Sequence, residues 1–207
     1  MYNIISSGSK GNCVIYLKSI AIDCGVPYSL IKSHINDLQI VLISHQHSDH
    51  LNISTMQKLA FERPGIRFGI GEFLKPFFDG IRNVDILEAG KLYDYGTFQI
   101  SPVKLFHDVS NFGYRIFKDD IKILHCTDSG HLQGIEAKNY DLYAIESNYD
   151  EETINELIAS KEANGEFAYQ KGVKNSHLSE QQARDFIFKN RGENSKVLRL
   201  HETSLLK

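Results

Sequence analysis

The most informative segment of the sequence is SHQHSDH (44–50), which directly follows the run QIVLI (39–43). The length and composition of that run predict a buried strand. Four candidate metal ligands therefore stand on a loop held by a rigid strand: His45, His47, Asp49 and His50. Imidazole and carboxylate groups suit Zn²⁺, Mn²⁺ or Fe. On an extended loop, His45 and His47 can reach one ion while Asp49 and His50 turn toward a second.

The composition is that of an ordinary globular chain. Its 207 residues are 42% hydrophobic and 24% charged, which predicts a single domain spanning 1–207. No apolar run approaches the roughly 20 residues of a membrane span. The start, MYNIISSGSKGN, lacks the pattern of an export signal, and three Cys do not suggest a disulfide framework. We therefore expect a cytoplasmic protein without a membrane partner.

Strand-like runs are interleaved with helical segments in both halves of the chain. Strands are predicted at 2–5, 13–18, 20–23, 39–44, 97–106, 112–118, 121–126, 141–147 and 196–200, and helices at 26–37, 52–62, 151–163 and 179–190. This order favours an α/β sandwich, with two sheets inside and helices outside.

The sequence HQHSDH (45–50) matches the HxHxDH signature of metallo-β-lactamase-fold hydrolases, a family with an αββα sandwich. The resemblance covers nearly the whole chain and is most specific to the YycJ (WalJ) type of exonuclease. The motifs that carry it, in order, are SGSKGN (7–12), IDCG (22–25), HD (107–108) with NFGY (111–114), TDSG (127–130), ESNYD (146–150) and SHLS (176–179).

This resemblance implies two divalent metal ions, zinc or manganese, and a role for each matched residue. His45, His47 and His107 would bind the first ion. Asp49, His50 and a late histidine would bind the second, and Asp128 would bridge the two. His107 and Asp128 both follow apolar strands, so both are expected at one cleft.

Two histidines compete for the late ligand position. His177 precedes a predicted helix, and His201 directly follows the last predicted strand. The pair resembles the ribonuclease Z arrangement, which assigns His201 to the second metal and His177 to transition-state stabilisation or proton transfer. If His201 were only a surface residue, His177 would be the ligand instead.

The chemistry implied is hydrolysis of a phosphodiester. Two cations lower the pKa of a bridging water, so that hydroxide attacks at neutral pH, and they neutralise charge on the phosphorus. Asp49 and His177 are the catalytic candidates. Only 20 residues separate His107 from Asp128, and 48 separate Asp128 from His177. These lengths leave no room for the tRNA-gripping arm of ribonuclease Z or the inserted β-CASP domain.

The favoured hypothesis is a 5′ exonuclease that acts on nucleic acid. The modestly basic C-terminal quarter of the chain is compatible with this substrate. From Ile158 onward there are nine Lys/Arg against six Asp/Glu. The first alternative hydrolyses small phosphodiesters such as cyclic nucleotides, and the second is a glyoxalase-II-like thioesterase. A metal-binding module without activity is disfavoured because no ligand is lost. Relatives commonly form homodimers, which the sequence does not decide here.

Overall fold

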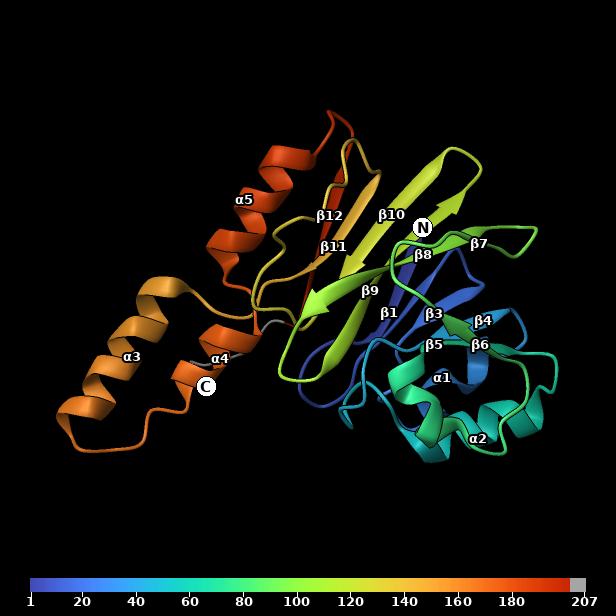
Figure 1. Cartoon of the computed structure of the whole chain (residues 1–207), viewed down its shortest axis with the longest axis horizontal. Coiled ribbons are helices and arrows are strands. Elements are labelled where there is room, and N and C mark those ends of the chain that lie inside the picture. The colour runs from blue at the N-terminus through green and yellow to red at the C-terminus, as the bar shows by residue number, and fades with distance from the viewer. Residues whose placement is uncertain (202–207) are drawn as a thin grey trace. The chain divides into compact units, whose positions relative to one another are not determined.

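The computed structural model describes residues 1–201 and divides the chain into two compact units, Met1–Lys91 and Leu92–Lys207 (Figure 1). The last six residues of the predicted 1–207 domain lie outside the described part. Within residues 1–201, every helix is too short or too polar to cross a membrane. Each unit is built on one six-stranded sheet.

The sheet of the first unit has the strand order β1-β2-β3-β4-β5-β6. Strands β1 to β3 pair antiparallel, and β3 to β6 pair parallel. The strands are β1 (Tyr2–Ser6), β2 (Cys13–Tyr16), β3 (Ile20–Ile22), β4 (Ile40–Leu42), β5 (Arg67–Gly71) and β6 (Val84–Leu87). The helices are α1 (Tyr28–Ile31), η1 (Lys32–His34), α2 (Ile53–Glu62) and η2 (Glu72–Phe78). One face of the sheet packs on these helices in a continuous apolar core.

The sheet of the second unit has the order β12-β11-β10-β9-β8-β7, with β12 at an edge. Strands β7 to β10 pair antiparallel, and β10, β11 and β12 pair parallel. They are β7 (Tyr93–Asp94), β8 (Gln99–Phe106), β9 (Ser110–Lys118), β10 (Ile121–Cys126), β11 (Leu142–Glu146) and β12 (Lys196–Leu200). The helices are α3 (Glu151–Ala163), α4 (Gln170–Ser176) and α5 (Glu180–Asn190).

The candidate ligands follow the carboxyl ends of strands. The 44–50 loop begins just after β4, His107 follows β8, Asp128 follows β10, and His201 follows β12. Loops at the carboxyl ends of parallel strands are where α/β sheets bind ligands, because the strands end there side by side. The parallel set β10, β11 and β12 therefore brings distant parts of the second unit together.

Most predicted elements are confirmed. Helix α3 has the predicted bounds, and α5 begins one residue later because Ser179 is its N-cap, with a complete capping box. Segment 26–37 departs from the prediction: it forms one short α-turn and then a 3₁₀ turn, α1 and η1. Ser, His, Asn and Asp after Lys32 are weak helix formers, so the helix is not continued.

The elements absent from the prediction have weak sequence signals. β5 carries two glycines in five residues, and η2 contains Pro76. Glycine and proline both argue against regular structure when a sequence is read alone. The short helix α4 has a glycine near its start, and it was also not predicted.

Candidate metal centre

In the first unit, Asp23 fixes the start of the histidine loop. It follows β3 with a φ of 59° and is 1% exposed. The Ser44 N–H donates to its Oδ1 (2.8 Å), and the Ser44 hydroxyl donates to its Oδ2 (2.9 Å). The carboxylate is thus hydrogen-bonded at both oxygens, although it is buried. This anchors the loop to the neighbouring strand end.

Asp23 also orients His50. The Nδ1 of His50 lies 2.7 Å from Asp23 Oδ2, and both side chains are buried. An ionised carboxylate only accepts, so Nδ1 carries the proton and Nε2 offers its lone pair. Metal-binding histidines are commonly held in this way by a second partner.

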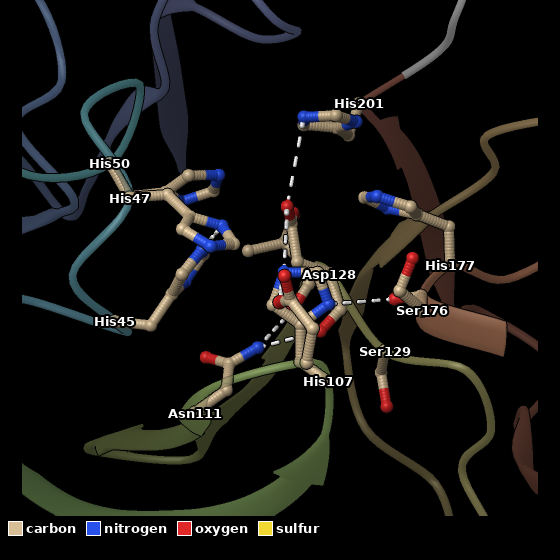
Figure 2. A network of polar contacts seen from close by, with 12 residues as sticks. His45, His47, His50, His107, Asn111, Asp128, Ser129, Ser176, His177 and His201 are labelled. Carbon is tan, nitrogen blue, oxygen red and sulfur yellow. Dashed lines mark hydrogen bonds and ion pairs between the residues drawn. The ribbon is translucent and has the colours of Figure 1, made fainter. Parts of the chain in front are cut away.

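His45 and His47 lie close enough to share one ion. The Ser44 hydroxyl gives its proton to Asp23, so its oxygen accepts from His45 Nδ1 (2.9 Å). His45 Nε2 is then the ring nitrogen with a lone pair for a metal ion, and it lies 3.1 Å from His47 Nδ1. Two nitrogens bound tetrahedrally to zinc at about 2.05 Å stand about 3.3 Å apart. Figure 2 shows the three histidines gathered on one loop.

The Asp49–His50 peptide is held in place by close backbone packing. The N–H of Asn12 donates to the Asp49 carbonyl (2.6 Å), and the N–H of Cys24 donates to the His50 carbonyl (2.9 Å). A Cβ on Gly25 would stand 1.8 Å from the Asp49 carbonyl oxygen, so only glycine fits there. The Asn12 amide reaches both His50 Nε2 (2.9 Å) and Asp49 Oδ2 (3.3 Å). These two ligand atoms therefore converge, 3.5 Å apart.

In the second unit, His107 is fixed by helix α4. Its Nδ1 donates to the carbonyl oxygen of Ser176 (2.9 Å), and its side chain is 2% exposed. Nε2 is left as the ligand atom, with Asp108 Oδ1 at 3.0 Å and Asp128 Oδ2 at 3.9 Å. Burial lowers the pKa of His107 more than the nearby carboxylates raise it, so the ring is neutral at physiological pH, as metal binding requires.

Asp128 lies between two histidines (Figure 2). Its Oδ2 is 3.9 Å from Nε2 of His107 and 3.8 Å from Nε2 of His201. The residue has a φ of 55°, and the side-chain amide of Asn111 donates to its carbonyl oxygen (2.6 Å). The Thr127 hydroxyl donates to Oδ1 (2.6 Å). One oxygen is thus satisfied by a neighbour while the other faces both imidazoles.

Glu146 was given no role by sequence reasoning, and it organises the rest of the cluster. It is fully buried at the end of β11. Its Oε2 accepts from the N–H groups of Ser129 (3.0 Å) and Leu178 (3.2 Å), and its Oε1 is 2.5 Å from His177 Nδ1. Both oxygens of this buried carboxylate are therefore engaged by polar neighbours. Burial acts to lower the pKa of His177, but the hydrogen bond and charge of Glu146 outweigh it, so the pKa is raised.

Both late histidines belong to one cluster of the second unit. Ligand atoms of Asp128, Glu146, His177 and His201 all lie within 4.8 Å of one another. The His177 and His201 rings stack with centroids 5.3 Å apart. Nδ1 of His201 lies 2.9 Å from the amide nitrogen of Asn148, and its Nε2 lies beside Asp128. His177 lies nearer to Glu146, and its Nδ1 is engaged there.

The cysteines are buried thiols. Cys13, Cys24 and Cys126 are all free and inaccessible. Burial raises the pKa of Cys126 to about 12, and a hydrogen bond with Cys24 together with burial raises that of Cys13. Metal ligation needs the thiolate, so these residues are core side chains.

A comparison with known families identifies the fold. Residues 21–189 match the family described as the beta-lactamase superfamily domain. The chain belongs to this superfamily.

The relatives agree with the superfamily assignment. Exodeoxyribonuclease WalJ of Streptococcus pneumoniae is 31% identical over 175 residues, a stretch that covers 74% of this chain and 64% of the relative. The chain thus spans less than two thirds of that protein.

Among solved structures, the metallo-beta-lactamase fold protein YhfI of Bacillus subtilis is 16% identical, with a TM-score of 0.73 over 99% of this chain and 86% of YhfI. Human short-form tRNase Z is 14% identical, with a TM-score of 0.72 over 97% of this chain and 92% of that one. The predicted αββα fold class and the family resemblance are confirmed.

The donor sets of this superfamily member fit divalent ions of the zinc and manganese kind. They consist of imidazole nitrogens and carboxylate oxygens, with second partners that fix the tautomers of His50, His45 and His107. The sequence indicated the ligand candidates but gave no role to Asp23 or Glu146. Both stand in motifs quoted for the resemblance, and that was the only signal for them.

Proposed function

We propose that the chain is a metal-dependent phosphodiesterase with two divalent ions, zinc or manganese, acting on nucleic acid as a 5′ exonuclease. His45, His47 and His107 would hold one ion, and Asp49, His50 and His201 the other, with Asp128 shared between them. The observation that carries the proposal is Asp128 Oδ2, which lies 3.9 and 3.8 Å from the Nε2 atoms of His107 and His201. A bridging carboxylate needs that placement.

Two cations held in this way would supply an activated water and would neutralise negative charge at the phosphorus. The chain's own residues do the rest. Asp49, anchored through its backbone by Asn12, contributes a carboxylate oxygen next to His50. Asp23 and Ser176 keep the protons of His50 and His107 on Nδ1, away from the ligand atoms. The donor atoms are therefore preorganised.

His177 is the proposed proton donor to the leaving oxygen. Glu146 holds Nδ1 of the ring and raises the pKa of His177 above its ordinary value, which favours the protonated form that a proton donor needs. Protonation of the leaving group by a positioned histidine accelerates such reactions by about 10²–10⁴-fold. The helix start at Ser179 and the Leu178 N–H bond to Glu146 fix the backbone on the other side of His177.

The substrate follows from the relative whose name states an activity, the exodeoxyribonuclease WalJ. We propose single-stranded DNA attacked from its 5′ side. Three free buried thiols suit a reducing compartment, so we place the protein in the cytoplasm. The single domain of 1–207 and a homodimeric assembly stay predictions.

The test uses a 30-nucleotide single-stranded DNA labelled at its 3′ end. Metal-stripped protein is reloaded with Mn²⁺ or Zn²⁺, and products are resolved with time. We expect a ladder that shortens from the 5′ end, with loss of activity in His177→Gln. Asp37→Asn, a change on the exposed surface of the first unit, is the control and should cleave as the wild type does.

The alternatives give different outcomes. Turnover of cyclic nucleotides without cleavage of DNA would move the assignment to a small phosphodiester. Turnover of S-lactoylglutathione with neither phosphodiester cleaved would move it to a thioesterase.

A further inference from the structure

The second unit has a groove on the side of its sheet covered by α5. It has a volume of about 500 Å³ and lies between α5 and the strands β11 and β12. Figure 1 shows α5 alongside this end of the sheet. Ile145, Ala183 and Ile187 form its apolar floor, and they belong to the core of the unit. The groove is therefore a fixed part of the fold.

Three arginines line this groove: Arg184 on α5, Arg191 at the C-cap of α5, and Arg199 on β12. All three are exposed. Arg199 pairs with Glu180 at 3.7 Å, and Glu180 is the one acidic residue in the lining. Among residues 1–201, the guanidinium groups of Arg184 and Arg191 have no hydrogen-bond or ion-pair partner. The groove thus has a surplus of positive charge and two forked donors available for an anionic ligand.

The spacing of Arg184 and Arg191 matches the spacing of phosphates along a nucleic-acid strand. They are seven residues apart, Arg184 within α5 and Arg191 at its C-cap, and a helical rise over seven residues separates them by about 10 Å along the axis. Stacked nucleic acid carries one phosphate per about 3.4 Å of strand, so this span corresponds to about three phosphates. Phe188 lies between them in the lining and is 80% exposed. A large aromatic ring in water between two arginines is suited to stacking on a base.

The groove starts next to the candidate metal centre. Ser147 lines it, and the preceding residue, Glu146, holds His177. Arg199 lies on β12, two residues before His201, which directly follows that strand. Successive side chains of a strand point to opposite faces, so β11 and β12 present groove residues on one face and cluster residues at their ends. Since β12 is an edge strand, the groove opens at the border of the sheet.

We propose that this groove, the arginine track of Arg184, Arg191 and Arg199 with Phe188, binds the backbone of single-stranded nucleic acid beyond the nucleotide being cleaved. The inference rests on the proposed nuclease function and adds a second binding surface to it. A purely apolar docking face would not need three arginines. Charge complementarity therefore favours the sugar-phosphate backbone of a nucleic acid over a second protein chain as the occupant.

The test measures binding separately from hydrolysis. A fluorescein-labelled (dT)20 with phosphorothioate linkages, which resist cleavage, is titrated with Mn²⁺-loaded protein at several NaCl concentrations. Each phosphate contact on a single strand contributes about −0.7 to the slope of log K against log salt. Arg184→Gln/Arg191→Gln should make the slope shallower by about 1.4. Phe188→Ala should weaken binding about tenfold with the slope unchanged.

The control removes two positive charges elsewhere in the same unit. Lys118→Gln/Lys189→Gln changes a lysine at the end of β9 and one on α5, and neither lines the groove. This variant should keep the wild-type slope to within about 0.3, because it loses no phosphate contact. All variants should hydrolyse bis(p-nitrophenyl) phosphate at the wild-type rate, since that substrate is too small to reach the track.

Each result decides for or against the track. The inference fails if the arginine variant keeps the wild-type slope of log K against log salt. It also fails if the lysine control loses as much slope as the arginine variant, even if the enzyme cleaves DNA. If Phe188→Ala changes only the sedimentation of a dimer and not DNA binding, the groove is a protein interface and the inference fails. If bis(p-nitrophenyl) phosphate is not hydrolysed but the slopes behave as expected, the track stands and the proposed chemistry fails.

Discussion

Asp23 shows how a residue outside the proposed ligand set can orient one of its members. Its buried carboxylate accepts from Ser44 and from His50 Nδ1, and the choice of tautomer at His50 depends on it. Removing a partner of this kind lowers metal affinity even when all ligands are present. Ser176 orients the ring of His107 in the same way, and Glu146 orients that of His177.

Asp23→Asn should weaken metal binding by about 10–100-fold. The amide nitrogen would face His50 Nδ1 as a second donor, so the proton of the ring would move to Nε2 and block the ligand atom. Competition with a chromophoric chelator measures the affinity, and Asp37→Asn is the matched control. Unchanged affinity in a folded Asp23→Asn protein would show that Asp23 does not set the tautomer.

Glu146→Gln should lower kcat by about 10²–10⁴-fold with little change in KM, because His177 loses the carboxylate that keeps it protonated. A general acid must carry its proton, so activity falls as pH rises through the pKa of His177. Without the charge of Glu146 that pKa is lower, and the alkaline limb of the kcat profile should move to lower pH. An unshifted limb would remove His177 from the role of acid.

Spacing in the sequence indicated the ligand candidates of the 45–50 loop, and the family resemblance added the distant ones, but the residues that orient them were given no role. The close spacing in the 45–50 loop indicates four ligand candidates, His45, His47, Asp49 and His50. Asp23 meets His50 across 27 positions, and Glu146 meets His177 across 31. Such pairs form only when strands are placed next to one another, so nothing local in the sequence marks them. An aspartate after a short strand is otherwise read as a turn residue.

At the scale of elements, the strand ends and the turns that hold them set the site geometry. Gly25 and Gly172 give a matched pair of tests. Gly25→Ala would put a Cβ 1.8 Å from the Asp49 carbonyl oxygen, while Gly172 in α4 has nothing within 4 Å. We expect Gly25→Ala to cost about 3 kcal/mol of stability and to weaken metal binding. Gly172→Ala should add about 0.5–1 kcal/mol.

Urea denaturation of the metal-free proteins measures both glycine variants. Equal stability of Gly25→Ala and the wild type would show that the 49–50 segment has room to move. It would also show that the backbone packing described for the first unit does not define the loop.

The strand β10 gives a pH prediction through Cys126. Burial raises its pKa to about 12 from an ordinary value of 9.0. A pKa that is higher in the folded than in the unfolded chain contributes stability that is complete below pH 9 and is lost as pH rises through 12. The free energy of unfolding should therefore fall more steeply from pH 9 to 11 in the wild type than in Cys126→Ala. Parallel curves for the two proteins would mean that the thiol titrates normally.

Element prediction succeeded where periodicity was strong and failed where local chemistry was ambiguous. Helices α3 and α5 carry clear caps, at Asp150 and Ser179, and were found with nearly correct bounds. Strand β5, with its two glycines, and η2, with its internal proline, were missed. Pairing with β4 and β6 stabilises β5 in the fold, and that information is not local.

At the scale of the whole molecule, the superfamily match from 21 to 189 runs across both compact units. The family resemblance assigns metal binding to residues of each unit: His45, His47, Asp49 and His50 in the first, and His107, Asp128 and His201 in the second. The proposed activity therefore needs residues of both units. Substitution of a single ligand should abolish it.

The most direct test of the central claim is hydrolysis of bis(p-nitrophenyl) phosphate by metal-stripped protein reloaded with Mn²⁺ or Zn²⁺, compared with Asp49→Ala. We expect metal-dependent turnover by the wild type, at least 10³-fold above Asp49→Ala, with both proteins equally folded. Absence of turnover with either metal, while two ions bind per chain, would contradict the assignment of phosphodiester chemistry to this centre.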